Sequence, residues 1–80
     1  MNETLKKHLF DFFSGKVTEI DEAIRKTLEQ SSQTTTTVVR HYFSGGSYKS
    51  AQFLFVSEAT YHRHIRKFLR NLEKMTKLSA

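Results

Sequence analysis

The chain has 80 residues, with no cysteine, no proline and three glycines. This length allows one small domain, the missing cysteines exclude disulfides and thiolate metal sites, and the scarcity of proline and glycine favours helices over a β-sandwich or barrel. The net charge of +5 is unevenly distributed along the chain. Residues 1–40 hold six basic and six acidic residues, whereas residues 41–80 hold seven basic and two acidic residues. The basic half predicts a polyanionic partner, although a solvated charged surface would have the same composition.

The chain carries no signal for export or membrane insertion. Its apolar runs fall short of the roughly 20 residues that span a bilayer, and residues 1–13 lack a signal-peptide cleavage pattern. We therefore expect a cytoplasmic protein without a membrane as partner. A basic amphipathic helix lying on anionic lipid is the alternative, and the neutral first half argues against it.

The first 30 residues predict two amphipathic helices. One is expected over residues 3–13, followed by Gly15, which can take the left-handed conformation that ends a helix. The second is expected over residues 18–30, where Asp21 stands three residues after Thr18 and resembles the second half of a capping box. Its buried side would be formed by Ile20, Ala23, Ile24 and Leu28.

The middle of the chain predicts a third helix over residues 35–43, which the glycine pair Gly45-Gly46 would end. A β-strand over residues 34–43 is the alternative, because threonine, valine, tyrosine and phenylalanine also favour strands. The polar run over residues 31–37 is either a linker or the beginning of this helix.

A short fourth helix is expected over residues 48–55, capped by Ser47, with Ala51 and Leu54 pointing inward. A long fifth helix is expected over residues 58–76, capped by Ser57. At about 100° per residue, its apolar face comprises Tyr61, Ile65, Phe68, Leu72 and Met75. Its opposite face comprises Ala59, Arg63, Arg66, Arg70 and Lys77, flanked by Lys67 and Lys74.

A short helix, a turn and a basic helix are the parts of a helix-turn-helix, whose second helix enters the major groove of DNA. Arginine and lysine neutralise phosphates, and arginine also binds guanine through two hydrogen bonds. On this hypothesis the first two turns of the basic helix face the base edges of DNA. The residues there are Glu58, Ala59, Thr60, His62 and Arg63, together with the cap Ser57. Phosphates would contact Lys49, Arg66, Lys67 and Arg70. An ordinary amphipathic helix with a solvated basic face is the alternative.

Residues 40–72 resemble region four of bacterial sigma factors. The matching residues are Ser47-Tyr48, Ala51, Ser57-Glu58-Ala59-Thr60 and Leu69-x-x-Leu72. A closer resemblance is to sigma-like phage transcription regulators of the ArpU and RinA type, with residues 9–30 as an upstream helical arm. The residues that carry it are Ser57, Thr60, Tyr61 and Arg63. The chain departs from the sigma pattern at Phe55, where the turn commonly holds glycine, and at Ser50, where an apolar residue is usual.

The resemblance implies a sequence-specific transcription regulator of phage or mobile-element origin, acting on double-stranded DNA in a bacterial host. It places promoter-reading positions at Glu58, Ala59, His62 and Arg63. The alternative function is a protein-interaction module, which binds RNA polymerase or another regulator through a sigma-like fold.

No metal, cofactor or catalytic activity is expected. His62 and His64 are two residues apart on a helix, so their side chains diverge by about 200°, and His8 and His41 are expected at the surface or partly packed. The chain has no glycine-rich phosphate loop, nucleophile elbow or paired-carboxylate motif.

The apolar face of the fifth helix has the 4-3-4-3 spacing of a heptad seam, which suits pairing with a second copy. A homodimer is therefore expected, either through Met75 and Leu78 or through Phe10, Phe12 and Phe13. The fold class expected from all these features is an all-α single domain over residues 1–80, with about five helices. Residues 1–33 would form the helical arm, and residues 34–80 the helix-turn-helix.

Overall fold

The computed structural model describes residues 3–76, and this part of the chain is all-α and contains no strand. Four α-helices and one 3-10 helix follow one another as α1 (Glu3–Phe13), α2 (Asp21–Gln30), α3 (Gln33–Phe43), η1 (Tyr48–Leu54) and α4 (Glu58–Thr76). The expected fold class is confirmed. None of the helices in residues 3–76 is long and apolar enough to cross a bilayer.

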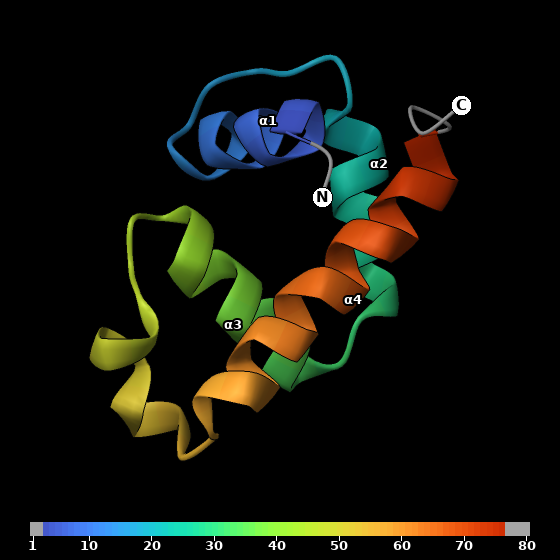
Figure 1. Cartoon of the computed structure of the whole chain (residues 1–80). Coiled ribbons are helices and arrows are strands. Elements are labelled where there is room, and N and C mark those ends of the chain that lie inside the picture. The colour runs from blue at the N-terminus through green and yellow to red at the C-terminus, as the bar shows by residue number, and fades with distance from the viewer. Residues whose placement is uncertain (1–2, 77–80) are drawn as a thin grey trace.

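The long helix α4 organises the packing of the other elements (Figure 1). Helix α3 lies beside its first half, α2 lies beside its second half, and α1 contacts both α3 and α4. The 3-10 helix η1 lies at one end of the molecule, where it packs on α3. A single apolar core joins all five elements, so the face that α4 turns away from it is left to solvent.

The buried face of α4 is the one that the sequence predicts. Tyr61, Phe68 and Leu72 are fully buried, and Ile65 is 3% exposed. Leu69 is also buried, next to the same stripe. The other elements contribute Leu5, Leu9, Ile24, Val38, Val39, Phe43 and Ala51 to the core.

Two helix starts differ from the prediction. Helix α2 begins at Asp21 rather than at Thr18, because the Asp21 carboxylate accepts hydrogen bonds from both the backbone N–H (2.9 Å) and the hydroxyl (2.6 Å) of Thr18. These bonds form a turn before the helix instead of its first turn. Helix α3 begins at Gln33, two residues earlier than predicted, because the Ser32 hydroxyl caps it by accepting the Thr35 N–H at 3.1 Å. The strand alternative for this segment is wrong.

The fourth helix also differs from the prediction. A regular helix over residues 48–55 was expected, but η1 is a 3-10 helix that ends at Leu54 and is kinked at Ala51 (φ −102°, ψ 19°). Its beginning is fastened by the Ser50 hydroxyl, which accepts the Ser47 N–H at 3.1 Å and donates to the Ser47 carbonyl at 3.0 Å. Phe55 follows in the left-handed conformation (φ 54°), which glycine adopts far more easily.

Candidate nucleic-acid interface

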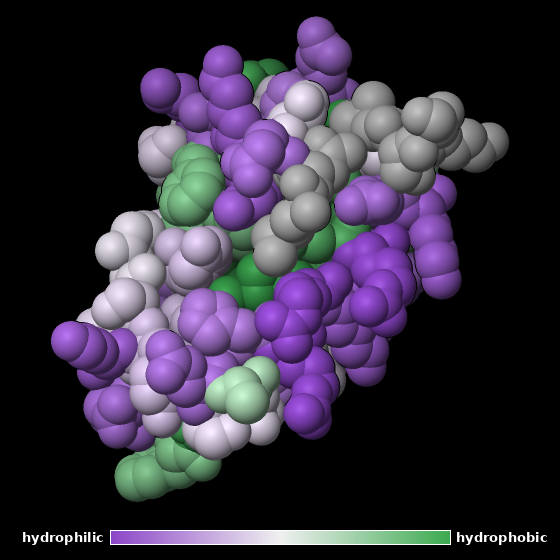
Figure 2. Space-filling view, viewed as in Figure 1, coloured by the Kyte–Doolittle hydropathy of each residue, from purple (hydrophilic) through white to green (hydrophobic). Residues whose placement is uncertain are grey.

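The outer face of α4 is strongly hydrophilic over the whole length that Figure 2 shows. Arg63, Arg66, Lys67 and Arg70 are all exposed there, and with Asn71 and Lys74 they line a shallow hollow. No carboxylate of residues 3–76 forms an ion pair with any of these cations. These five cations of α4, called the basic stripe below, therefore have their charge available for an anionic partner. Lys77, which was expected to extend the stripe, lies outside the described residues.

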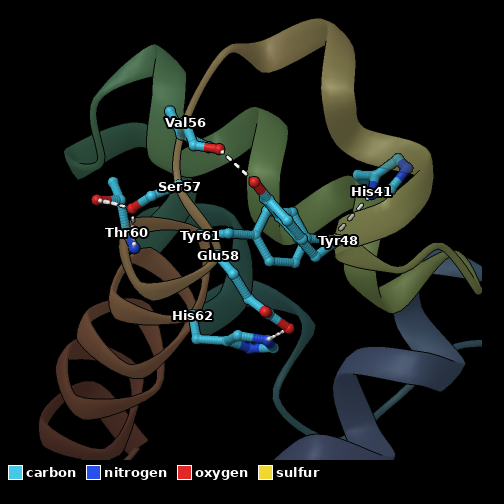
Figure 3. Close-up of polar contacts among 8 residues, drawn as sticks. All are labelled: His41, Tyr48, Val56, Ser57, Glu58, Thr60, Tyr61 and His62. Atoms are coloured by element: carbon cyan, nitrogen blue, oxygen red, sulfur yellow. Dashed lines mark hydrogen bonds and ion pairs between the residues drawn. The ribbon is translucent and has the colours of Figure 1, made fainter.

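Helix α4 begins with the cap that was predicted (Figure 3). The Ser57 hydroxyl accepts the Thr60 backbone N–H at 3.1 Å and donates to the Thr60 hydroxyl at 3.0 Å. Ser57, Glu58 and Ala59 are exposed, whereas Thr60 is partly buried. The first turn of α4 thus presents small and polar side chains to solvent, with Arg63 exposed on the following turn.

The predicted reading residue His62 is partly held by its own helix and by aromatic neighbours. Its Nε2 atom lies 3.9 Å from a carboxylate oxygen of Glu58 (Figure 3), and its ring packs edge-on against Tyr61 and Tyr42. The side chain is still 43% exposed. Glu58 and His62 therefore form one polar unit at the edge of the basic stripe.

Lys49 stands apart from the other predicted site residues, because it belongs to η1 rather than to α4. It is exposed. The position of η1 relative to α4 decides whether Lys49 and the α4 stripe can contact one DNA duplex, so the contacts that hold η1 belong to the site.

Two tyrosines hold η1 and the following turn against α3 and α4 (Figure 3). The Tyr48 hydroxyl of η1 donates to the Val56 carbonyl at 3.0 Å, across the turn before α4. The Tyr61 hydroxyl of α4 lies 2.9 Å from Nδ1 of His41 in α3, and the other ring nitrogen of His41 lies 3.1 Å from the Ser50 hydroxyl of η1. His41 thus links all three elements, a role that sequence reasoning missed.

The phenol of Tyr61 is kept in its protonated form. Burial raises its pKa above the ordinary value of 10, and the neighbouring Tyr42 raises it further. A phenol is protonated at neutral pH even with its ordinary pKa, and the upward shift extends this state to higher pH, so the hydroxyl can donate a hydrogen bond.

A second histidine joins α3 to α4 without touching η1. Nδ1 of His64 lies 2.8 Å from the Thr35 hydroxyl, which also accepts a hydrogen bond from the Ser32 hydroxyl at 3.1 Å. His64 therefore packs against the beginning of α3, while His62 faces the edge of the basic stripe. Within residues 3–76 no group of three or more His, Cys, Asp and Glu side chains could hold a metal ion.

The aromatic residues expected at a dimer interface pack mainly within the chain. Phe10 contacts Phe43 edge-on at 4.9 Å and stays 41% exposed, while Phe12 and Phe13 are partly buried beneath Arg25 and Arg40. Met75 is partly buried, and Leu78 lies outside the described residues. Other apolar side chains are more exposed, namely Val17 (90%) between α1 and α2, and Phe55 (94%) and Phe53 (59%) beside the turn before α4.

Comparison of this chain with protein-family models, with curated proteins and with solved structures gave no match.

Proposed function

We propose that this protein is a sequence-specific DNA-binding transcriptional regulator of phage or mobile-element origin. Its helix α4 would enter the major groove of double-stranded DNA. The observation that carries the proposal is the unpaired row of exposed cations on α4, on the face opposite the buried stripe and directly after a capped helix start.

The dimensions of this row suit a duplex. Arg63 and Lys74 are eleven residues apart, which corresponds to roughly 16 Å along a helix, and the major groove is about 12 Å wide. One end of the row can therefore lie in the groove while the other end contacts the phosphates beside it. Lysine and arginine at the phosphates release counterions, which supplies affinity without sequence preference.

Sequence preference would come from the first turns of α4. Arg63 can bind guanine O6 and N7 through two hydrogen bonds, and the Glu58 carboxylate can accept a hydrogen bond from the N4 amino group of cytosine. Ser57, Ala59, Thr60 and His62 lie on the same turns, and Ala59 leaves room for a close approach to the bases. Lys49, Arg66, Lys67 and Arg70 would position the protein through phosphates.

The test is selection of duplexes from a random pool, followed by fluorescence-anisotropy titration at two salt concentrations. Arg63→Ala should remove the preference for the selected site, because it removes a base contact. Arg66→Ala should weaken binding to every duplex and lower the salt slope by about 1. Lys7→Ala is the matched control, because it removes an exposed cation from α1 and should bind as the wild type does. Weak binding without any preferred sequence would contradict the proposal.

A second candidate function is a protein-interaction module for RNA polymerase or another regulator. The observation that favours this module is the exposure of Phe53 and Phe55 beside the turn, where a partner could cover both rings. In that case alanine at Phe53 or Phe55 should abolish regulation in cells, while Arg63→Ala and Arg66→Ala should leave it intact. A homodimer is a separate proposal.

A further inference from the structure

His41 lies where the three elements of the helix-turn-helix meet. It belongs to α3, its Nδ1 atom is 2.9 Å from the Tyr61 hydroxyl of α4, and its Nε2 atom is 3.1 Å from the Ser50 hydroxyl of η1 (Figure 3 shows the contact with Tyr61). Tyr61 and Ser50 are eleven residues apart in sequence, and His41 bonds to both of them.

The hydrogen atoms in this chain of contacts can be assigned by counting donors. The Ser50 hydroxyl donates its single hydrogen to the Ser47 carbonyl, so it must accept from Nε2–H of His41. In the neutral imidazole Nδ1 is then the acceptor, and it receives the Tyr61 hydroxyl proton. Every donor finds an acceptor, in the order Tyr61, His41, Ser50, Ser47.

The ring of His41 is confined to this orientation by its neighbours. A Cβ atom on Gly46 would lie 2.5 Å from Cε1 and 2.7 Å from Nε2 of His41, so glycine is the one residue that leaves room for the ring. The Gly46 N–H also donates to the His41 carbonyl at 2.9 Å. On another side the ring of Phe53 packs edge-on at 5.8 Å.

Apolar packing of η1 is modest. Ala51 is its one fully buried side chain, and Tyr48 and Leu54 are partly buried against the core. Directional hydrogen bonds from His41 and Tyr48 therefore add to this packing in fixing where η1 and its Lys49 lie relative to α4. Specific binding requires phosphate contacts and base contacts at the same time. A displacement of η1 relative to α4 therefore weakens specific complexes more than non-specific ones.

We propose that His41 is a positioning residue that fixes η1 against α4 through the Tyr61–His41–Ser50 chain and so sets the preference for specific over non-specific DNA. This inference rests on the proposed DNA-binding function. His41 itself need not contact DNA, because it acts through the placement of Lys49 and the α4 stripe.

The test is a double-mutant cycle on the two ends of the chain. Ser50→Ala and Tyr61→Phe each remove one hydroxyl, and each should lower affinity for the selected duplex about fivefold, as expected for one hydrogen bond. Affinity for a random duplex at the same salt should fall by a smaller factor, because only the phosphate contact of Lys49 is then displaced. The double mutant should lose clearly less affinity than the product of the two single fold-losses, because either substitution alone already interrupts the row of hydrogen bonds. In a His41→Leu background both changes should lose their effect.

Two further variants separate positioning from a general loss of stability. Thr35→Val removes the hydroxyl that bonds to His64, which is also an α3–α4 hydrogen bond but does not involve η1. It should lower thermal stability and leave the ratio of specific to random affinity unchanged.

His41→Gln, whose amide offers one acceptor and one donor, should restore part of the selectivity that His41→Leu loses.

Independent effects of Ser50→Ala and Tyr61→Phe, or an equal loss for specific and random duplexes, would overturn the inference. If the wild-type protein selects no duplex, the proposed function fails, and the role of His41 is decided by amide hydrogen exchange of residues 48–54. His41→Leu should then speed exchange in η1 but not in α2, and unchanged protection of η1 would overturn the inference separately.

Discussion

Helices α2 and η1 are both short elements beside the central core, yet they are held in different ways. Helix α2 buries Ile24 fully and Thr27 almost fully, and it packs along α4. The 3-10 helix η1 buries Ala51 fully and Tyr48 and Leu54 partly, leaves Phe53 mostly exposed and is also bonded to His41 of α3. The comparison teaches that buried apolar side chains anchor the first element, whereas the second one combines modest apolar packing with directional polar contacts.

The largest effect should come from removing the apolar anchor of α2. Ile24→Ala should lower the free energy of unfolding by about 3 kcal/mol, because a fully buried isoleucine leaves a cavity in the core. Phe53→Ala in η1, although it removes a larger side chain, should cost less than about 1 kcal/mol because Phe53 is mostly exposed. Urea denaturation of both variants measures the difference, and equal losses would contradict the comparison.

The next effect should come from crowding His41. Gly46→Ala should destabilise the protein by about 2 kcal/mol, because the new Cβ must displace the imidazole ring or the backbone beside it. Gly45→Asn is the control for a substituted glycine that meets no neighbour, since nothing lies within 4 Å of a Cβ there, and its cost is the backbone strain at φ 95° alone. Thermal melts should place the Gly46 variant below the Gly45 variant. The reverse order would mean that His41 is held loosely.

A smaller and opposite effect should come from the left-handed Phe55. Phe55→Gly should raise the free energy of unfolding by about 1 kcal/mol relative to Phe55→Ala, because alanine keeps the steric cost at φ 54° and glycine does not. Both variants lose the same exposed ring, so their difference isolates the backbone. In a domain of this size the melting temperature should differ by about 5 °C. Identical melting temperatures would show that the turn carries no strain.

The smallest effect should come from the polar turn before α2. The hydroxyl of Thr18, together with its backbone N–H, holds the pKa of Asp21 below its ordinary value. A carboxyl whose pKa is lowered by folding adds stability above its unfolded pKa, and this stability is lost as the pH falls through its folded pKa. Melting temperatures of the wild type should therefore fall more steeply below about pH 4 than those of Asp21→Asn. Parallel curves would contradict this role of Asp21.

Most of the fold could be predicted from the sequence because it depends on local patterns. The spacing of Tyr61, Ile65, Phe68 and Leu72 predicts the buried face of α4, and Ser57 predicts its cap. Residues 48–55 were predicted as a regular helix because their composition suits one. The structure has a 3-10 helix there that is kinked at Ala51, and its hydrogen bonds to His41 and Val56 join residues that local composition does not relate.

Part of the candidate site was also predictable, because it too depends on a local sequence pattern. The cationic face of α4 follows from helical periodicity, and the structure brings Arg63, Arg66, Lys67 and Arg70 together on it. The contacts of His41 were not predictable, because its partners stand nine and twenty residues further along the chain and no short motif relates them. The left-handed conformation of Phe55 was not predicted, because Phe55 was expected inside the fourth helix and its lack of glycine was read as a departure from the sigma pattern.

The unpaired cations of α4 also affect the protein in the absence of any partner. Arg63 is three and four residues from Arg66 and Lys67, and Arg70 follows the same two at four and three residues. Like charges at these separations repel one another on a helix surface. Dissolved salt should therefore stabilise the free protein by screening this repulsion, while it should weaken the proposed complex with DNA. Folding and binding would respond to ionic strength with opposite signs, and a duplex would relieve a repulsion that the free helix must bear.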